Sequence, residues 1–431
     1  MTTALLTDRY ELTMIDAALR AGTHDRECVF EVFARRLPEG RRYGIVAGTG
    51  RLLELIADFR FGDAELEWLR DNRVVTAATI AWLADYRFGG DIAGYREGEV
   101  YFPGSPLLVI EGTFAEAVVL ETLALSVLNY DSAVASAAAR MVGAANGRPI
   151  AEMGSRRATE RGAVAAARAA FIAGFGATSN LEAGRSWGIP TMGTAAHAFT
   201  LLHDTEEQAF RAQVDALGAS TTLLVDTYDV TAAVDLAISV AGPSLGAVRI
   251  DSGDLPEQVS TVRKQLDGLG AVDTRITVTN DLDEYTIAAL RSAPVDSYGV
   301  GTSVVTGSGH PAAGLVYKLV ARRDDTGAWI AVAKKSAEKA TVGGRKNPVR
   351  EMSGGRATSE TIHIGDDVAA PGARPLHVRL MTAGIADGRF LGADGTRLAR
   401  EHRAAAVAEL PADALRLSRG EPAIPTVYRP E

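Results

Sequence analysis

The charged residues Arg249 and Asp251 stand two positions apart in the sequence RIDSGDL. On a β-strand, residues at this spacing point to the same face of the sheet. A planar guanidinium can bind a carboxylate in a bidentate manner, and the Asp251 carboxylate can accept hydrogen bonds from sugar hydroxyls or lie near a metal ion. A structural ion pair is the alternative, so the spacing alone does not separate binding from structure.

A histidine, His197, follows an apolar segment in WGIPTMGTAAHAFTLLH, residues 187–203. The pattern predicts a strand, a tight exit at Gly193 and Thr194, and a helix that begins near His197. The imidazole would then lie beside the backbone amides of a helix N-terminus, where anions are favoured. A lone histidine in such a position is more often structural than catalytic. A zinc site with His203 is disfavoured, because no cysteine is nearby and residues six apart do not share a helix face.

Two further motifs have the composition of anion-binding loops. Arg156 and Arg157 follow a glycine in EMGSRRAT, and two guanidinium groups beside a glycine turn can hold a dianionic group such as pyrophosphate, although a structural role for one of them is the alternative. In GVGTS, Gly301 and Thr302 would present free amides and a hydroxyl to a phosphate, although a tight turn without a ligand explains the same glycines. Each motif is weak by itself, so its weight depends on the elements that position it.

A repeated pattern of apolar segment and helix-compatible stretch places these motifs. Strands are predicted at residues 149–153, 189–193, 222–226, 247–251, 275–279 and 297–301. Repeats of this kind are typical of a parallel α/β barrel or a doubly wound sheet, in which the active site lies at the carboxyl ends of the strands. All the motifs above follow a predicted strand, as do residues 280–281. So do Asp226 and Asp229 in VDTYD, which could bind magnesium or ribose hydroxyls or form a pair of helix caps.

The segments on either side of this repeat predict a different kind of structure. We expect an amphipathic helix with Tyr10 in its first turn, a turn-rich antiparallel sheet, a long buried helix or two joined at residues 129–131, a β-hairpin, a basic solvated loop and a last helix. These correspond to residues 5–20, 88–114, 115–146, 317–332, 334–350 and 404–419. The expected domains are residues 1–120, an α/β barrel over 121–318 that carries the active site, and 319–431.

Composition excludes several classes of protein. With 431 residues, 47% of them hydrophobic and 23% charged, the chain is long enough for two or three packed domains. A net charge of −9 argues against nucleic acid as the main partner. Cys28 is the only cysteine, so an intrachain disulfide cannot form, and a reducing compartment is expected. Asp8 and Glu11 interrupt any signal-peptide core, and no apolar run has membrane-spanning length, so we expect a cytoplasmic protein without a membrane partner.

Six motifs in this chain together resemble those of the nicotinate phosphoribosyltransferases. In order, they are DRYELTM, EMGSRRA, GTAAH, VDTYD, RIDSGDL and GVGTSVVTG, and they extend from about Thr7 to Lys318. The resemblance implies an irregular TIM-like α/β barrel with a flanking α+β domain built from N- and C-terminal segments. It also implies that nicotinate is joined to 5-phosphoribosyl 1-pyrophosphate, giving nicotinate mononucleotide and pyrophosphate in the salvage route to NAD.

The resemblance further implies roles for individual residues, a requirement for Mg²⁺ and coupling to ATP hydrolysis. His197 would be phosphorylated, and Asp251 would face the ribose. Tyr10 would stack on the pyridine ring, contributed by the neighbouring subunit of a homodimer. The remaining residues bind substrate: Thr194 and Arg249 the nicotinate, Gly301 and Thr302 the 5-phosphate, and Met153 and Arg156 the base and pyrophosphate side. The metal ligands are not identified. Ala198 replaces a residue that is polar in many members, which puts one hydrogen bond to substrate in question.

Other functions remain open at this point. The nearest alternative is nicotinamide phosphoribosyltransferase, but Arg249 with Thr194 and no acidic residue in GTAAH favours a carboxylate over a carboxamide. A barrel lyase or aldolase would need a Schiff-base lysine at a strand end, and the predicted strand ends have none. A binding or regulatory subunit would be expected to have lost the strand-end motifs, which are intact.

Overall fold

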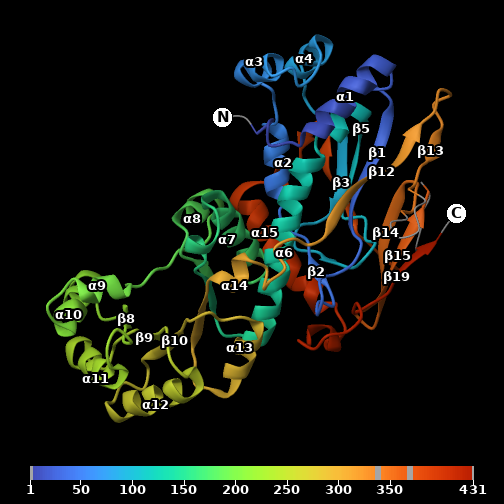
Figure 1. Cartoon of the computed structure of the whole chain (residues 1–431). Coiled ribbons are helices and arrows are strands. Elements are labelled where there is room, and N and C mark those ends of the chain that lie inside the picture. Colours follow the sequence, from blue (N-terminus) through green and yellow to red (C-terminus); the bar gives the residue numbers. More distant parts are fainter. Residues whose placement is uncertain (1–2, 335–340, 366–371, 430–431) are drawn as a thin grey trace. The chain divides into compact units, whose positions relative to one another are not determined.

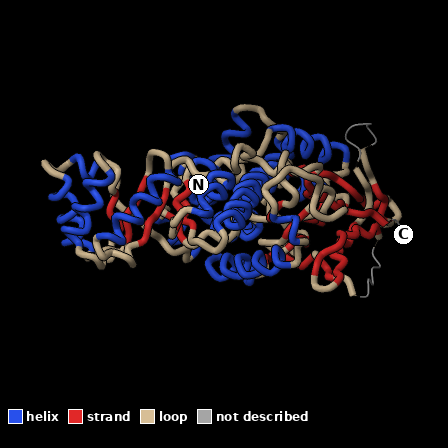
Figure 2. The backbone as a smooth tube through the Cα atoms, turned by 90° about the horizontal axis from the view of Figure 1, so that it is seen from below, coloured by secondary structure: helices blue, strands red, loops and turns tan. Residues whose placement is uncertain are grey.

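The chain forms two compact units (Figure 1). This computed structural model describes residues 3–334, 341–365 and 372–429. The flanking unit comprises Met1–Ser136 and His310–Glu431, and the sheet unit comprises Ala137–Gly309. Helix α6 (Glu121–Ala145) passes from the first into the second. Both units contain helices and strands (Figure 2).

The sheet unit is built on a parallel sheet of six strands in the order β7-β6-β11-β10-β9-β8. Their bounds are β6 (Ile150–Glu152), β7 (Ala177–Thr178), β8 (Thr222–Leu224), β9 (Ala247–Ile250), β10 (Arg275–Val278) and β11 (Ser297–Val300). The sheet is open in the described residues, because β7 and β8 are edge strands that do not pair with each other. The expected α/β class is therefore confirmed, with an incomplete ring of strands in place of a closed barrel.

Helices connect these strands, as parallel pairing requires. They are η1 (Ser155–Arg157), α7 (Glu160–Ile172), α8 (Leu181–Trp187), α9 (His197–Leu201), α10 (Glu206–Leu217), α11 (Val230–Ala241), α12 (Leu255–Gly268), α13 (Glu284–Ala289), η2 (Leu290–Ser292) and α14 (Thr302–Val305). In Figure 1, α10, α11 and α12 lie outside β8, β9 and β10. Asp229 and Asp254 cap α11 and α12 by accepting backbone N–H bonds, so each chain leaves its strand and enters a helix at a fixed point.

The predicted strand at residues 189–193 is wrong. Ile189 is buried, but it packs with Ala167 and Ala183 of the adjacent helices, which explains the apolar pattern without a strand. Pro190 has no N–H to donate, and pairing is limited to an isolated bridge between Thr178 and Thr191. The strand that does occupy this edge is β7, which is too short to be recognised from its sequence.

The flanking unit contains a seven-stranded and a four-stranded sheet. The first has the order β13-β12-β1-β5-β3-β17-β18, and the second has the order β16-β14-β15-β19. The bounds are β1 (Glu27–Ala34), β3 (Asp91–Tyr95), β5 (Leu108–Thr113), β12 (Leu315–Arg323), β13 (Trp329–Ala331), β14 (Lys346–Ser353), β15 (Arg356–Ile364), β16 (Arg374–Pro375), β17 (His377–Thr382), β18 (Ile385–Ala386) and β19 (Thr426–Arg429); β2 (Gly44–Ile45) and β4 (Val100–Tyr101) form a separate pair. The expected antiparallel sheet and the hairpin of β12 and β13 are confirmed.

Several helices of the flanking unit begin or end at residues other than those predicted. They are α1 (Arg9–Ala21), α2 (Thr49–Ala57), α3 (Asp63–Asp71), α4 (Ala77–Ala84), α5 (Phe114–Val118), η3 (Gly388–Phe390), α15 (Gly392–Ala408) and η4 (Ala412–Leu415). The last helix begins earlier than predicted and ends before Pro411, which cannot continue a helix. The long apolar region forms two helices, which was one of the two predicted alternatives. The break lies between the end of α5 and the start of α6, whereas residues 129–131, the predicted junction, are helical.

The helical region from Phe114 to Ala145 is both long and apolar. Within the described residues, one helical stretch, Phe114–Ala145, is long and apolar enough to cross a membrane by length and composition, and 67% of its most apolar window is buried inside the protein. Its buried alanines, leucines and valines contribute to the core of the flanking unit. The basic loop predicted at 334–350 lies partly outside the described residues. Its last residues, from Lys346 to Arg350, belong to β14, and both Lys346 and Arg350 are buried in ion pairs. The expectation of a solvated face is therefore wrong for these residues.

Candidate active site

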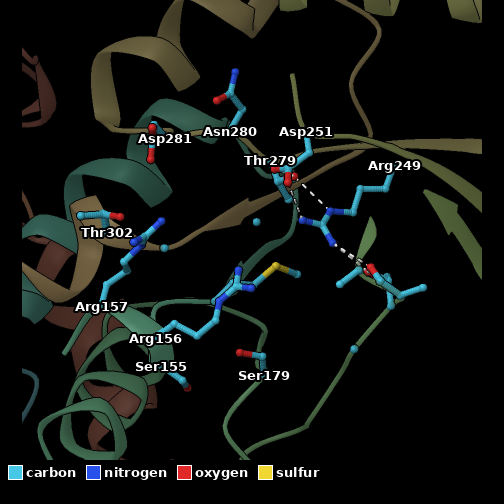
Figure 3. A pocket seen from close by; sticks show the side chains of 17 residues that line it. Ser155, Arg156, Arg157, Ser179, Arg249, Asp251, Thr279, Asn280, Asp281 and Thr302 are labelled. Carbon is cyan, nitrogen blue, oxygen red and sulfur yellow. Dashed lines mark hydrogen bonds and ion pairs between the residues drawn. The ribbon is translucent and has the colours of Figure 1, made fainter. Parts of the chain in front are cut away.

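A pocket of about 480 Å³ lies at the carboxyl ends of the parallel strands (Figure 3). Residues that follow β6, β7, β10 and β11 line it, together with two residues at the end of β9 and the segment before α9. The side chains with polar or charged groups are Ser155, Arg156, Arg157, Ser179, Thr194, Arg249, Asp251, Thr279, Asn280, Asp281 and Thr302. Of the nine residues proposed from the sequence, seven line this pocket: Met153, Arg156, Thr194, Arg249, Asp251, Gly301 and Thr302.

Arg249 is held by neighbours on three sides. Its Nε donates to Thr279 Oγ1 at 3.0 Å, and its Nη2 forms an ion pair with Asp251 Oδ2 at 3.1 Å. Its Nη1 donates to Thr194 Oγ1 at 3.0 Å and to the Ala195 carbonyl at 3.4 Å. The same-face placement predicted for Arg249 and Asp251 is therefore present, and the pair is an ion pair within the pocket wall (Figure 3).

These contacts limit the hydrogen bonds that Arg249 can donate to a ligand. A guanidinium has five N–H groups, and protein acceptors take four of them. Among the described residues, one N–H on Nη2 has no acceptor, so a ligand carboxylate can bind there. Bidentate binding also requires the ligand to share or replace the contacts at Nη1, which come from Thr194 and Ala195. Thr194 and Arg249 therefore form one hydrogen-bonded unit in the pocket wall.

Arg156 and Arg157 differ from Arg249 because they are exposed and lack partners. Both belong to η1, which follows β6, and neither guanidinium has a hydrogen-bond or ion-pair partner in the described part of the chain. Figure 3 shows Arg157 beside Thr302 and Arg156 nearer the centre of the pocket. Two unpaired cations at the wall of one pocket repel each other unless an anion lies between them. The pocket is therefore complementary to a multiply charged anion.

Close packing between strand ends explains the glycines of two motifs. A Cβ at Gly299 would overlap Met153 Sδ and Thr279 Cγ2, and a Cβ at Gly154 would overlap Val305 Cγ1. Glycine at these positions lets the backbones after β6 and β11 approach each other at the pocket floor. Beneath them, Glu152 is buried and accepts hydrogen bonds from Thr178 Oγ1 and the Gly154 amide, while burial raises the pKa of its carboxyl. This carboxyl joins the β6 and β7 ends of the pocket.

Several pocket residues had no proposed role in the sequence interpretation. The sequence marks Asn280 and Asp281 only as polar residues after a strand, and both have positive φ, 94° and 39°. Such conformations cost free energy and cluster at functional sites, but φ is not readable from the sequence. Ser179 follows the two-residue strand β7, and no sequence pattern marks it. Thr279 could have been found, because it is the first polar residue after the buried strand β10.

His197 does not line the pocket wall, although it belongs to the same side of the unit. It is the first residue of α9, as expected, and its side chain is 41% exposed. Its Nδ1 lies 3.1 Å from Thr227 Oγ1, and its Nε2 lies 4.0 Å from Asp226 Oδ1. Asp226 Oδ2 accepts hydrogen bonds from the Asp251 amide and from Ser252 Oγ, so one carboxylate connects the histidine to the Arg249–Asp251 loop.

Asp226 has one buried oxygen without a protein partner. Its side chain is 1% exposed, and Oδ1 has no hydrogen-bond partner among the described residues. An unsatisfied buried carboxylate oxygen is costly, so it indicates a cation, a water or a protonated imidazole next to it when the protein is working. Asp229, the other acid of VDTYD, caps α11, which explains it as a structural residue.

Tyr10 belongs to the flanking unit. It lies in the first turn of α1, and its side chain is 46% exposed. Burial of the hydroxyl end and the neighbouring Glu121, to which it hydrogen bonds, raise the pKa of Tyr10. The same region holds Glu11, whose carboxyl accepts hydrogen bonds from the Thr122 amide and hydroxyl and whose pKa burial raises to about 7. Tyr10 is thus a partly exposed aromatic residue beside Glu121.

Comparison with known proteins agrees with this arrangement. The sequence model of the nicotinate phosphoribosyltransferase N-terminal domain matches residues 5–129. Nicotinate phosphoribosyltransferase pncB1 of Mycobacterium tuberculosis is 56% identical over 98% of this chain and 94% of its own length. The chain belongs to the nicotinate phosphoribosyltransferase family. The Bacillus subtilis nicotinate phosphoribosyltransferase is 37% identical over 84% of this chain and 76% of its own length.

The fold comparison extends over both units. Human nicotinic acid phosphoribosyltransferase has a TM-score of 0.82 with 24% identity, over 98% of this chain and 97% of the human one. This similarity concerns the fold. In this nicotinate phosphoribosyltransferase family member, the shared fold also covers the last hundred residues, which lie beyond the six family motifs.

The acidic groups of the pocket allow a test of the metal that the family resemblance implies. Asp251 and Asp281 are the carboxylates that line it. No group of three or more His, Cys, Asp or Glu that could hold a metal ion occurs in the described residues. Mg²⁺ at phosphate sites is usually bound by one or two carboxylates together with the substrate phosphates and waters. The residues therefore fit a magnesium ion that arrives with a phosphorylated substrate, and they do not fit a preformed structural metal site.

Proposed function

We propose that this chain is a nicotinate phosphoribosyltransferase that joins nicotinate to 5-phosphoribosyl 1-pyrophosphate in the salvage route to NAD. One observation carries the proposal. A single pocket combines two unpaired arginines, Arg156 and Arg157, with a third arginine, Arg249, that is positioned by Thr194 and keeps one N–H for a ligand. This charge arrangement suits two anionic groups of different size, a pyrophosphate and a carboxylate.

In this proposal, each part of the two substrates has its own set of pocket residues. Arg249 and Thr194 bind the nicotinate carboxylate, with Met153 against the ring. Figure 3 shows Arg249 on one side of the pocket and Asp281, Thr302 and Arg157 on the other. Thr302 and the backbone at Gly301 bind the 5-phosphate, Arg156 and Arg157 bind the pyrophosphate, and Asp251 accepts hydrogen bonds from the ribose.

The chemistry follows from this placement. The bond between the ribose C1 and pyrophosphate breaks, and the pyridine nitrogen forms a new bond to C1. The transition state resembles an oxocarbenium ion, so catalysis depends on charge placement and orientation more than on a strong base. Arg156 and Arg157 stabilise the charge that develops on the departing pyrophosphate. The Asp251 carboxylate lies on the side of the developing cation.

Magnesium and ATP complete the proposal. When bound, Mg²⁺ neutralises the phosphate oxygens, and Asp251 with Asp281 would hold it. His197 accepts the γ-phosphoryl group of ATP on a ring nitrogen, and ADP leaves. Support for this role comes from the partner-free Asp226 Oδ1, which lies 4.0 Å from the histidine and can stabilise the imidazolium formed by the transfer. The added phosphate brings negative charge next to the loop of Asp251 and can order it.

We further propose a homodimer in which Tyr10 of one subunit stacks on the pyridine ring in the other. The partial exposure of this aromatic residue supports such a role. A cytoplasmic location, where the nucleotide substrates occur, agrees with the single buried cysteine.

The base specificity separates this proposal from nicotinamide phosphoribosyltransferase. A carboxamide is neutral and gains less than a carboxylate from Arg249. The purified chain is incubated with phosphoribosyl pyrophosphate, Mg²⁺ and either nicotinate or nicotinamide, with and without ATP, and the mononucleotide is quantified. We expect turnover of nicotinate, stimulation by ATP and negligible turnover of nicotinamide. Efficient use of nicotinamide would overturn the assignment.

A further inference from the structure

We propose that Arg140, Glu284 and Ser308 form a positioning cluster that holds the phosphate side of the pocket in its binding geometry. The inference rests on the proposed function, because it assigns these residues to binding of phosphoribosyl pyrophosphate. None of the three lines the pocket. They are positioning residues, which act through the loops that do.

The cluster consists of one buried carboxylate with a partner on each oxygen. Glu284 Oε1 accepts from Arg140 Nε at 3.0 Å, and Glu284 Oε2 accepts from Ser308 Oγ at 2.7 Å. Arg140 Nη2 also donates to the Tyr285 hydroxyl at 3.2 Å. Glu284 is 3% exposed and Arg140 is 8% exposed. A buried charge pair of this kind is a weak source of stability but fixes geometry strongly, because breaking it leaves an unpaired buried charge.

One side of Glu284 leads to the loop of Asn280 and Asp281. Glu284 is the first residue of α13, three positions after Asp281, and Asp283 caps this helix through the Tyr285 and Thr286 amides at 3.0 and 2.7 Å. Two consecutive non-glycine residues with positive φ are strained and persist only where the surroundings force them. The cap and the buried Glu284 provide that constraint at the end of the loop.

The other side of Glu284 leads to the turn after α14. The Ser308 amide donates to the Ser303 carbonyl at 2.7 Å, and Thr306 Oγ1 donates to the Thr302 carbonyl at 2.8 Å. Ser308 has a φ of 52° and stands between two glycines that also have positive φ. Its backbone therefore closes the short helix that begins at Thr302, while its side chain is bound to Glu284. One carboxylate thus connects the segment of Asn280 and Asp281 with that of Gly301 and Thr302.

This connection has a specific consequence for binding. Without the Ser308 hydroxyl, both loops keep every group that touches a ligand, but their relative geometry is less constrained. The loss falls on the side of the pocket opposite Arg249, which is joined to Thr194, Thr279 and Asp251 and has no contact with the cluster. We therefore expect weaker binding of phosphoribosyl pyrophosphate with little change in the binding of nicotinate.

The experiment compares Ser308→Ala, Ser308→Gly and Glu284→Gln with the wild type. Both serine variants lose the hydroxyl, but only glycine relieves the positive φ. We expect both to raise the KM for phosphoribosyl pyrophosphate about fivefold, the effect of one ordinary hydrogen bond. Glu284→Gln should raise it about twentyfold, because Arg140 also loses its charge partner. The KM for nicotinate and kcat should stay within about twofold of the wild type in the serine variants.

A matched control is Thr274→Ala. Thr274 is 1% exposed, and its hydroxyl donates to the Leu245 carbonyl at 2.9 Å, at the amino ends of the strands. It loses one hydroxyl that donates a hydrogen bond, as the serine variants do, but this hydroxyl has no connection to the pocket, so its KM values should match the wild type. Melting temperatures of all variants report the loss of stability. A serine variant that behaves like Thr274→Ala, or one that raises both KM values equally, would overturn the proposal.

The outcome is separable from that of the proposed function. An inactive wild type refutes the function but leaves the geometry testable, because inorganic phosphate, the probe for the site at Gly301 and Thr302, can then be titrated calorimetrically into the wild type, Ser308→Ala and Thr274→Ala. The cluster predicts about fivefold weaker phosphate binding for Ser308→Ala alone. Equal affinities in the three proteins would overturn it there too.

Discussion

Replacement of Arg249 by lysine tests how the pocket recognises a carboxylate. Arg249 makes four hydrogen bonds, to Thr279, Thr194, Ala195 and Asp251. Lysine keeps the positive charge but concentrates its donors on one nitrogen, so it cannot contact these groups and a carboxylate at the same time. The variant should fold, because the site is partly solvated and the charge opposite Asp251 is retained.

The magnitude follows from the hydrogen bond that lysine cannot make. A hydrogen bond to a charged group contributes about 2 kcal/mol, which corresponds to about 30-fold in kcat/KM. We therefore expect Arg249→Lys to lower kcat/KM for nicotinate about 30-fold, and Arg249→Gln, which also loses the charge, to lower it by about 1,000-fold. Residual turnover of nicotinamide should change much less, because a neutral carboxamide does not use the charge.

The matched control is Arg263→Lys. Arg263 also donates through all three nitrogens, to Asp267 and to the Thr274 and Ala271 carbonyls, but at the opposite ends of the strands. Initial rates over a matrix of both substrate concentrations give kcat/KM for each variant. The reasoning is refuted if Arg249→Lys loses no more activity toward nicotinate than Arg263→Lys, or if nicotinate and nicotinamide lose activity equally.

Three further predictions concern other groups. His197→Ala should abolish the ATP stimulation and the incorporation of label from γ-labelled ATP while the ATP-independent reaction continues; unchanged stimulation contradicts the role. Arg156→Gln and Arg157→Gln should each raise the KM for phosphoribosyl pyrophosphate about tenfold with a smaller effect on nicotinate, and product inhibition by pyrophosphate should weaken in parallel. Burial lowers the pKa of His377 to about 4, so the unfolded chain binds a proton there first as the pH falls below about 6.5, and stability is lost from that pH downward. His377→Gln, which can still donate to the Pro106 carbonyl, should show a smaller fall in melting temperature between pH 7 and pH 4.5; an unchanged fall excludes this group.

The sequence predicted five of the six parallel strands and brought seven of the nine proposed residues to one pocket. Residues after strands could be placed together, because the carboxyl ends of parallel strands meet at one edge whatever the details of the helices. Arg249, Asp251 and Arg156 thus line one pocket although up to about a hundred residues separate them. The ion pair between Arg249 and Asp251 follows from a spacing of two on a strand.

The features that the sequence did not predict are determined by contacts between residues far apart in the chain. Residues 189–193 have the apolar composition of a strand, but Ile189 is buried against helices, and β7 takes the position at the sheet edge. Asn280 and Asp281 have positive φ values shortly before Glu284, whose cluster joins three separate segments. Such features arise from tertiary contacts and leave no local pattern.

Family membership and site geometry lead to one central claim, that this pocket joins nicotinate to a phosphoribosyl group. The most direct measurement is proton NMR of a mixture of the purified chain, nicotinate, phosphoribosyl pyrophosphate, Mg²⁺ and ATP, followed over time. The account predicts that the free pyridine resonances are replaced by those of nicotinate mononucleotide in the wild type and far more slowly in Arg249→Gln. No mononucleotide from the wild type, with nicotinate unchanged, would contradict it.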